Sequence, residues 1–307
     1  MKETLLIALG GNALIKAGET GTIEEQLHNL RVPIRQIARL SRNYRIIITH
    51  GNGPQVGDLL LQQECCDAVP PMPLEILVAQ TQGEIGYMIE STLDSELMDL
   101  GINTEKRIVS LISYVVVDEN DPAFQDQSKP IGPFYTEERA SKLPYPTRKT
   151  AKGYRRVVAS PRPITIVEKR EIRDLIEMDF IVICCGGGGI PVVREGRSFC
   201  GVDAVIDKDL ASAVLAQEVG VDIFLIATDV SGVALNFGKE SEAFLRSLTA
   251  SDAERYLRSG QFPPGSMGPK VEAAVKFIAG GGKRAVITSI DAIEEAVAGR
   301  SGTEITK

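Results

Sequence analysis

Short apolar runs alternate along this chain with longer stretches in which apolar residues recur every three or four positions. An uninterrupted apolar run of about four to eight residues is typical of a strand buried on both faces, and the periodic stretches are typical of helices. The runs predict strands at residues 4–9, 45–49, 108–117, 180–185, 222–227 and 284–288. The periodic stretches predict helices at about residues 22–43, 54–61, 74–100, 166–178, 210–218, 249–259, 271–279 and 290–298.

Strands that alternate with helices predict an α/β fold with a mainly parallel sheet covered on both faces. Residues 22–25 have the capping-box pattern that begins a helix, and residues 192–194 with 198–201 predict a hairpin. Pro33 lies inside the first predicted helix, where a proline removes a backbone hydrogen bond. We therefore expect a kink there, or a break into two helices.

One long segment, residues 118–163, has a different character. It is rich in Pro, Lys and Arg and has little apolar periodicity, and it is too long for an ordinary loop. We interpret it as a small lobe that protrudes from the main body. The chain is then a single domain, 1–307, with an N-terminal half of about 1–165 that carries the lobe and a C-terminal half of about 166–307.

The composition excludes several classes of protein. Of 307 residues, 43% are hydrophobic and 24% charged, and the net charge of −7 argues against a nucleic-acid binder, which needs a basic field. The apolar runs are too short for a signal peptide or for the roughly 20 residues of a membrane span. The cysteines match neither a disulfide framework nor zinc-ligand spacing, so we expect reduced thiols in a cytoplasmic protein. They are Cys65, Cys66, Cys184, Cys185 and Cys200.

Glycine-rich turns follow three of the predicted strands, at residues 10–11, 51–53 and 186–189. Ligands of parallel sheets bind beyond the carboxyl ends of the strands, where glycine amides and helix N-termini can hold an anion. The spacing of residues 51–57 resembles a dinucleotide fingerprint, but Pro54 interrupts it and no acidic residue follows at the required distance. A nicotinamide-dependent enzyme is therefore the weaker interpretation. The chain also has no Walker phosphate-binding loop.

Two lysines lie at predicted helix N-termini, where the helix dipole already presents positive charge. They are Lys208, between Asp207 and Asp209, and Lys270, after Pro269. A cation at such a position is unfavourable unless an anion joins it, so the pair predicts a phosphate ligand. Phosphoryl transfer needs mainly positioned positive charge and Mg²⁺, which lysines and glycine amides can supply.

Other polar residues have simpler explanations. His50, at a strand end, could be a base, but a hydrogen-bonded structural histidine is the more common case. We expect His28 to lie on the surface, and Cys184 and Cys185 to be core thiols. Read alone, Lys129 would be a solvated loop charge.

The motifs taken together resemble those of the carbamate kinases within the amino-acid-kinase family. Two runs are specific to that family, HGNGPQVG over residues 50–57 and KPIGPFY over residues 129–135. The matching pieces follow the same order from end to end, at residues 8–14, 49–57, 81–88, 117–118, 121–125, 129–135, 154–161, 186–191, 201–211, 228–230 and 265–271. The resemblance therefore covers essentially the whole chain.

This resemblance implies a homodimeric three-layer αβα sandwich with a protruding subdomain. It implies reversible, Mg²⁺-dependent phosphoryl transfer between ATP and carbamate, which gives ADP and carbamoyl phosphate, with the Mg²⁺ carried by the nucleotide. Arginine or ureide catabolism would run it towards ATP. The catalytic residues would be Lys129, Lys208, Asp209 and Lys270, with Asp209 orienting the lysines. Carbamate and the phosphoryl group would be held by Gly10, Gly11, Asn12, Gly51, Asn52 and Gly53. The nucleotide would contact Lys208, Asp229, Phe237, Met267 and Lys270.

The chain departs from the family pattern in the predicted lobe. Residues 136–152 form a shorter segment than usual, and residues 151–154 read Ala-Lys-Gly-Tyr in place of Gly-Arg-Gly-Trp. Both changes bear on how the lobe closes. Pro33 is also unusual for the family. We expect Asp207 only to serve the helix that follows it.

Two alternatives stay open on the sequence. A kinase of the same fold could act on another small carboxylate, such as glutamate or aspartate. The other alternative is a sensor that binds nucleotide without catalysis. A sensor would be free to lose at least one of Lys129, Lys208, Asp209 and Lys270, and the presence of all four argues against it.

Overall fold

A computed structural model describes residues 2–65, 68–150, 152–263 and 265–307. Cys66, among the cysteines expected to be reduced, and Ala151, in the lobe segment that departs from the family pattern, lie outside the described residues. The main sheet has eight strands, and its order is β15-β17-β16-β12-β1-β2-β9-β3. Their bounds are β15 Ser247–Thr249, β17 Thr303–Thr306, β16 Arg284–Ser289, β12 Ile223–Thr228, β1 Thr4–Leu9, β2 Arg45–His50, β9 Phe180–Ile183 and β3 Arg107–Ser110.

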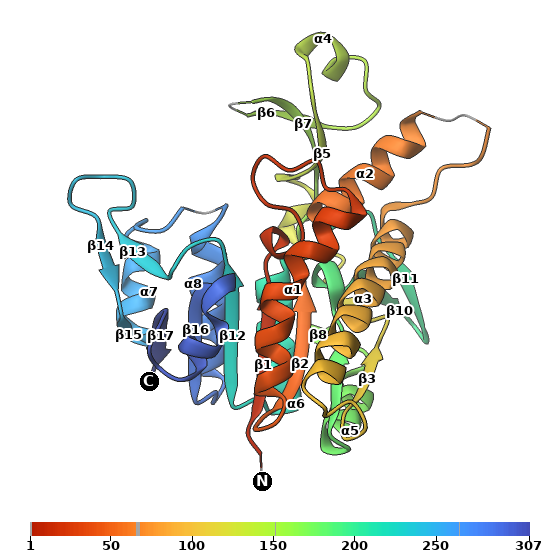
Figure 1. The fold of residues 1–307 in the computed structure, drawn as a ribbon. Helices are drawn as coiled ribbons and strands as arrows, with labels where there is room; N and C mark the ends of the chain where they lie inside the picture. The colour runs from red at the N-terminus through yellow and green to blue at the C-terminus, as the bar shows by residue number, and fades with distance from the viewer. Residues whose placement is uncertain (1, 66–67, 151, 264) are drawn as a thin grey trace.

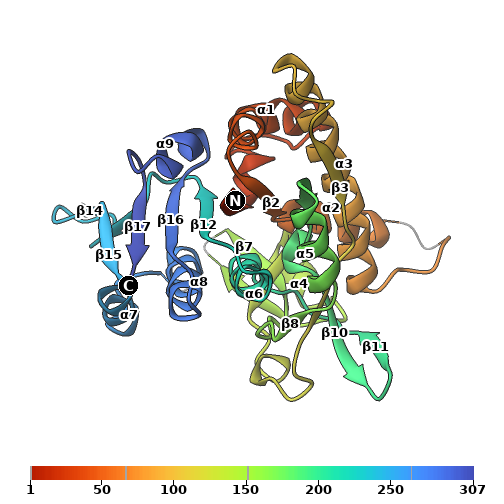
Figure 2. The same ribbon diagram turned by 90° about the horizontal axis from the view of Figure 1, so that it is seen from below.

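The main sheet is the middle of three layers (Figure 2). Strands β16, β12, β1, β2, β9 and β3 are mutually parallel, and β17 is antiparallel to β16. One face is covered by α1 Ile23–Leu40, α3 Leu74–Asp99 and α9 Ile293–Val297. The other is covered by α5 Lys169–Glu177, α6 Lys208–Val219, α7 Ala250–Arg258 and α8 Met267–Ala279. The predicted αβα sandwich is confirmed.

Strand β1 illustrates why the central strands are uninterrupted apolar runs. Leu5, Ile7 and Leu9 pack beneath α1 and α3, whereas Leu6 and Ala8 point to the opposite core beneath α6 and α8. All five are fully buried. A strand buried on both faces cannot alternate with polar residues, which is why these strands were predicted correctly from the sequence.

The strand predicted over residues 108–117 is wrong, because the chain forms two strands in two sheets. β3 ends at Ser110 in the main sheet, and β4 Tyr114–Val116 belongs to a four-stranded sheet of order β11-β10-β4-β8. Between them the Gln82 side chain binds both the N–H and the C=O of the buried Ser113, and so replaces ladder hydrogen bonds at the turn. The other strands of the four-stranded sheet are β8 Thr165–Ile166, β10 Ile190–Glu195 and β11 Ser198–Gly201. Of these, β10 and β11 form the predicted hairpin.

Residues of the predicted lobe form a separate three-stranded sheet, which stands beyond the upper ends of the main strands in Figure 1. The strands of this sheet are β5 Lys129–Tyr135, β6 Thr147–Thr150 and β7 Gly153–Val158, and the helix α4 Glu137–Ala140 lies between β5 and β6 in the sequence. β5 packs against α2 Gly53–Glu64, where a Cβ on Gly57 would lie 3.2 Å from the Cα of Gly132. This close approach fixes the base of the lobe, and with it Lys129, beside the N-terminal half of α2.

Other local predictions need correction. Helix α1 begins at the predicted capping box but runs past Pro33 without a break. Pro33 is buried among the apolar residues of that helix, and their packing holds the helix together although one hydrogen bond is lost. The helix predicted from residue 166 begins at Lys169, after β8, and α8 begins at Met267 rather than residue 271. The strands β13 Val233–Leu235, β14 Ala243–Leu245, β15 and β17 were not predicted.

Among the described residues, no helix combines the length and the apolar character that crossing a bilayer requires.

Candidate active site

The site lies beyond the carboxyl ends of β1, β2 and β12, which are parallel neighbours and therefore end at the same edge of the sheet. The turns after these strands carry Gly11, Gly51 and Asp229. The N-terminus of α6 comes to the same edge, since the Thr49 hydroxyl of β2 lies 2.7 Å from the Ser212 hydroxyl of α6. Ser212 in turn donates to the carbonyl of Lys208. A buried hydrogen-bond chain thus fixes the start of α6 against β2.

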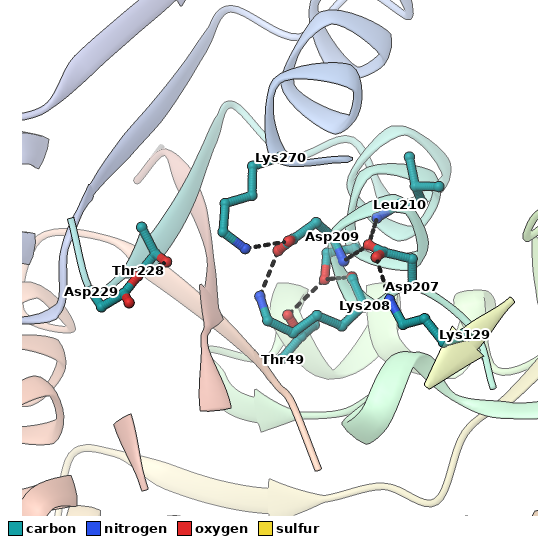
Figure 3. Close-up of polar contacts among 10 residues, drawn as sticks. Thr49, Lys129, Asp207, Lys208, Asp209, Leu210, Thr228, Asp229 and Lys270 are labelled. Carbon is teal, nitrogen blue, oxygen red and sulfur yellow. Dashed lines mark hydrogen bonds and ion pairs between the residues drawn. The ribbon is translucent and has the colours of Figure 1, made fainter. Parts of the chain in front are cut away.

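Asp209 is the centre of the charged cluster (Figure 3). One of its carboxylate oxygens pairs with the ammonium of Lys208, and the other lies 2.9 Å from that of Lys270. The Asp209 side chain is only 4% exposed. Burial alone would raise the pKa of Asp209, but the charges of Lys208 and Lys270 outweigh it and lower the pKa to about 2. Asp209 is therefore a fixed anion that holds two lysines from different helices side by side.

The two lysines respond oppositely to this arrangement. Burial lowers the pKa of Lys208, and the nearby charge of Asp209 only partly offsets that effect. Burial also lowers the pKa of Lys270, but the combined effects of Asp209, Asp207 and Asp229 outweigh it, so that the net shift is upwards. Two ammonium groups in a partly dry site repel each other, so an added anion would be bound favourably between them.

Lys129 reaches the same site from the lobe. Its Nζ lies 3.1 Å from one oxygen of Asp207. The other oxygen of Asp207 accepts the N–H groups of Asp209 and Leu210, at 3.0 and 3.4 Å, and so caps α6. The prediction that Asp207 only serves its helix is therefore wrong, because the sequence could not reveal that the lobe brings a lysine to its second oxygen.

The glycine turns line a cavity of about 300 Å³ among these charges. Its lining includes Gly11, Gly51, Asn52, Gly53 and Gly187 together with the charged residues Lys129, Asp207, Lys208, Asp209 and Lys270. At Gly51 a Cβ would lie 3.4 Å from the amide nitrogen of Gly11. The absence of side chains here lets two backbone segments come together, and the N–H of Gly51 donates to the carbonyl of Leu9 at 3.0 Å.

A second cavity of about 610 Å³ adjoins the first, and Ser266 and Lys270 line both. The residues predicted to surround the nucleoside, Asp229, Phe237 and Met267, all line this second cavity. Its walls are largely apolar and aromatic, with Phe244 and Phe262 besides Phe237. Lys270 therefore stands between an apolar cavity of suitable size for a nucleoside and a small cationic one.

Comparison with known proteins places the chain in a family. Residues 3–289 match the model of the amino acid kinase family. The chain belongs to the amino acid kinase family. It is 49% identical to a carbamate kinase from Thermococcus kodakarensis, over 99% of each chain, and 47% identical to a carbamate kinase from Pyrococcus furiosus, also over 99% of each. The structure of a carbamate kinase from Giardia lamblia bound to AMP-PNP superimposes with a TM-score of 0.93 and 40% identity, covering 100% of this chain and 99% of that one.

Within this member of the amino acid kinase family, two predicted ligand-binding residues lie apart from the small cavity. The N–H of Gly10 donates to the carbonyl of Ala227 at 2.9 Å and so serves the junction of β1 with β12. Asn12 is exposed and lines a neighbouring hollow with Lys16 and Asp229. Neither residue lines the cavity that holds the other predicted residues.

The third glycine turn, residues 186–189, has a mainly structural role. A Cβ on Gly186 would overlap with the ring of His50, and one on Gly187 with the side chain of Asn52. Asn52 itself donates to the Thr81 hydroxyl at 2.9 Å. The run lets buried side chains approach the backbone, and within it only Gly187 reaches the cavity.

His50 has the properties of a structural histidine. Burial lowers its pKa to about 4, and the charge of Lys208 acts in the same direction. Its Nδ1 lies 3.1 Å from the carbonyl of Gly51. It is therefore neutral near pH 7 and packed behind the glycine turn. Cys184 and Cys185 are buried core thiols, as predicted, while Cys65 is exposed and Cys200 partly so.

Several site residues were missed at the sequence level. Ser266 links the two cavities, Phe244 and Phe262 line the larger one, and Thr49 with Ser212 anchors α6. A signal existed only for Ser212, because it is a polar residue within the run of apolar residues 210–216 that α6 buries. The aromatic residues come from segments without periodicity, so nothing in the sequence brought them to one pocket.

Proposed function

We propose that this protein is a carbamate kinase, which transfers a phosphoryl group reversibly between ATP and carbamate. The observation that carries the proposal is the shared carboxylate of Asp209, which holds Lys208 of the smaller cavity beside Lys270, a residue that lines both cavities. Full-length similarity to several carbamate kinases supports carbamate as the acceptor.

Each cavity would take one part of the reacting pair. The nucleoside would occupy the larger cavity near Asp229, Phe237 and Met267, with its phosphates beside Lys270 and Lys208. Carbamate would lie in the smaller cavity against Gly11 and the turn at residues 51–53. Asn12 and Gly10 would act there only indirectly, through the shape of their turn.

The transfer itself needs little covalent help from the protein. A carbamate oxygen attacks the γ-phosphorus of ATP, the bond from that phosphorus to the bridging oxygen breaks, and ADP leaves with the bonding electrons. Carbamate is already an anionic nucleophile, so no general base is required, which agrees with the neutral, buried His50. Lys129, Lys208 and Lys270 would stabilise the charge on the equatorial oxygens, which is the main requirement of phosphoryl transfer.

Mg²⁺ would enter as part of the nucleotide substrate. Among the described residues there is no group of three or more His, Cys, Asp or Glu side chains suited to a resident ion. The carboxylates of Asp229 and Glu242 both line the larger cavity, and Asp229, which accepts a hydrogen bond from the Thr228 hydroxyl at 3.0 Å, would face a nucleotide-borne ion. Homodimer formation, a cytoplasmic location and a physiological direction towards ATP in arginine or ureide catabolism remain predictions.

The direct test is ATP formation from ADP and carbamoyl phosphate, measured in a coupled assay with Mg²⁺ present. We expect turnover that a metal chelator abolishes. Glutamate and aspartate, offered with ATP, should not stimulate ADP formation. Absence of turnover in a preparation that still binds ADP would refute the proposal in favour of a nucleotide sensor, and turnover with an amino acid instead would identify a different kinase of the same fold.

A further inference from the structure

Asp207 has two separate sets of partners, one for each carboxylate oxygen. Oδ1 accepts the N–H groups of Asp209 and Leu210, and Oδ2 accepts from the Nζ of Lys129 at 3.1 Å. Capping a helix requires only one oxygen, and Ser or Asn would serve equally well. The cap therefore leaves the negative charge of Asp207 and its second oxygen unexplained.

The charge is explained by the lysine that it faces. Three lysines surround the small cavity, and the two from the main body share Asp209. Lys129 comes from the lobe, and its ion-pair partner within the described part of the chain is Asp207. The side chain of Lys129 is 39% exposed and that of Asp207 only 17%. The fixed, more buried acid thus holds the end of a longer and more exposed side chain that has many rotamers of its own.

Asp207 also lies in a position that couples it to the rest of the site. Its backbone begins α6, so the carboxylate that binds Lys129 is one residue from Lys208 and two from Asp209. Its charge raises the pKa of both Lys208 and Lys270, although less than Asp209 does. The Asp207 side chain therefore binds the lobe lysine directly and acts on the two lysines of the main body through its charge.

We propose that Asp207 is a positioning residue, which sets the Lys129 ammonium at the transfer cavity by binding it with the oxygen that the helix cap does not use. This role rests on the proposed function insofar as Lys129 takes part in phosphoryl transfer. The contact between Asp207 and Lys129 itself can be tested without any assumption about the reaction.

The kinetic test uses Asp207→Asn, because asparagine keeps the cap and removes the charge. We expect kcat for ATP formation to fall about 5- to 30-fold, on the scale of a coupled contact pair, with less than about a twofold change in the KM for ADP. The KM should change little because Lys129 does not line the larger cavity. Asp203→Asn is the matched control, since Asp203 pairs with Arg156 of the lobe at 3.3 Å but lies outside the small cavity.

A double-mutant cycle separates positioning from a general structural effect. In a Lys129→Ala background, Asp207→Asn should lower kcat further by less than about twofold, because the group through which it acts is gone. An equal fall in both backgrounds would overturn the proposal and assign the effect to Lys208 or to α6. Asp207→Ser, which caps but is too short to reach Lys129, should reproduce the result for Asp207→Asn.

A second readout does not depend on activity. Acetylation of Lys129 by acetic anhydride, measured by mass spectrometry in the intact protein, should be several-fold faster in Asp207→Asn, while acetylation of Lys142 in the same lobe stays constant. Unchanged labelling of Lys129 would overturn the proposal whatever the kinetics show. If labelling is faster in Asp207→Asn but the unmodified protein makes no ATP, the contact is upheld and the proposed function is refuted.

Discussion

Asp207 and Asp209 are identical residues two positions apart, yet they organise two different regions of the site. Asp209 is buried in the main body and binds two lysines from α6 and α8. Asp207 is less buried, caps α6 and meets a lysine from the lobe. Asp207 is the N-cap of α6 and has an extended backbone, whereas Asp209 lies within the first helical turn, and their side chains meet different partners. One carboxylate therefore serves the body and the other the lobe.

The difference separates a fixed part of the site from an adjustable one. Lys208 and Lys270 are held on packed helices and are largely withdrawn from water, so their charges are strong and need no reorganisation. Lys129 is carried by a small separate sheet and remains partly solvated. We expect losses in the body cluster to cost more than losses in the pair between Lys129 and Asp207, and the following experiments test that ranking.

The largest effect should follow loss of a body lysine. We predict that Lys208→Ala or Lys270→Ala lowers kcat by about 10²–10³, the scale of one preorganised electrostatic contact. Steady-state ATP formation from carbamoyl phosphate measures it. Lys276→Ala, which removes an exposed lysine from the same helix α8, is the matched control. Near-normal rates in both body variants would refute the roles assigned to them.

Loss of the lobe lysine should cost somewhat less. We predict a fall in kcat of about 10² for Lys129→Ala, because water can partly replace a half-exposed ammonium. Lys142→Ala removes a lysine from the same lobe, where it pairs with Glu138, and should leave the rate unchanged. If Lys129→Ala altered only the association of subunits, its placement at the site would be wrong.

The pH dependence of stability should report on His50. Its pKa is about 4 in the folded protein and near 6.5 when unfolded, so the unfolded state takes up the proton first as the pH falls. The contribution of His50 to the free energy of unfolding is therefore fully present above about pH 6.5. It should decline by up to about 3 kcal/mol towards pH 4.

Urea unfolding between pH 7.5 and pH 4.5 measures this decline. His50→Gln lowers stability at every pH through lost packing, but should make the slope between pH 6.5 and 5 shallower. An unchanged slope would show that His50 is protonated in the folded state. The activity profile should have no inflection from His50, because the reaction uses no base.

The smallest effect concerns the helix cap. Asp207→Ala loses both the cap and the contact with Lys129, whereas Asp207→Asn loses only the contact. We predict that the alanine variant is less stable than the asparagine variant by about 1 kcal/mol, the usual value of an N-cap. Equal unfolding midpoints in urea would contradict the capping role of Oδ1.

Much of the fold could be predicted from the sequence because the central strands are buried on both faces. Runs such as residues 4–9 can be read without knowledge of their partners. The prediction failed where a partner decides the structure. Residues 108–117 are one apolar run, yet the Gln82 side chain divides them between two sheets. Similarly, β17 becomes a strand because β16 and β15 lie on either side of it.

The site was predictable to a similar degree. Two lysines at helix N-termini indicated an anion, and they do meet at one carboxylate. The glycine turns were less informative, since residues 51–53 line a cavity whereas residues 186–189 mostly accommodate His50 and Asn52. Composition alone does not distinguish a glycine that leaves space for a ligand from one that leaves space for a side chain. The second partner of Asp207 depended on where the lobe sits, which no local pattern encodes.

The most direct test of the ranking compares Asp209→Asn with Asp207→Asn in one assay, ATP formation from saturating ADP and carbamoyl phosphate, on variants shown to be folded by circular dichroism. We predict that kcat falls by about 10²–10³ for Asp209→Asn, because two buried lysines lose their shared anion, and by about 5- to 30-fold for Asp207→Asn. Equal losses, or a rate for Asp209→Asn within about fivefold of the unmodified protein, would contradict the central place given to Asp209.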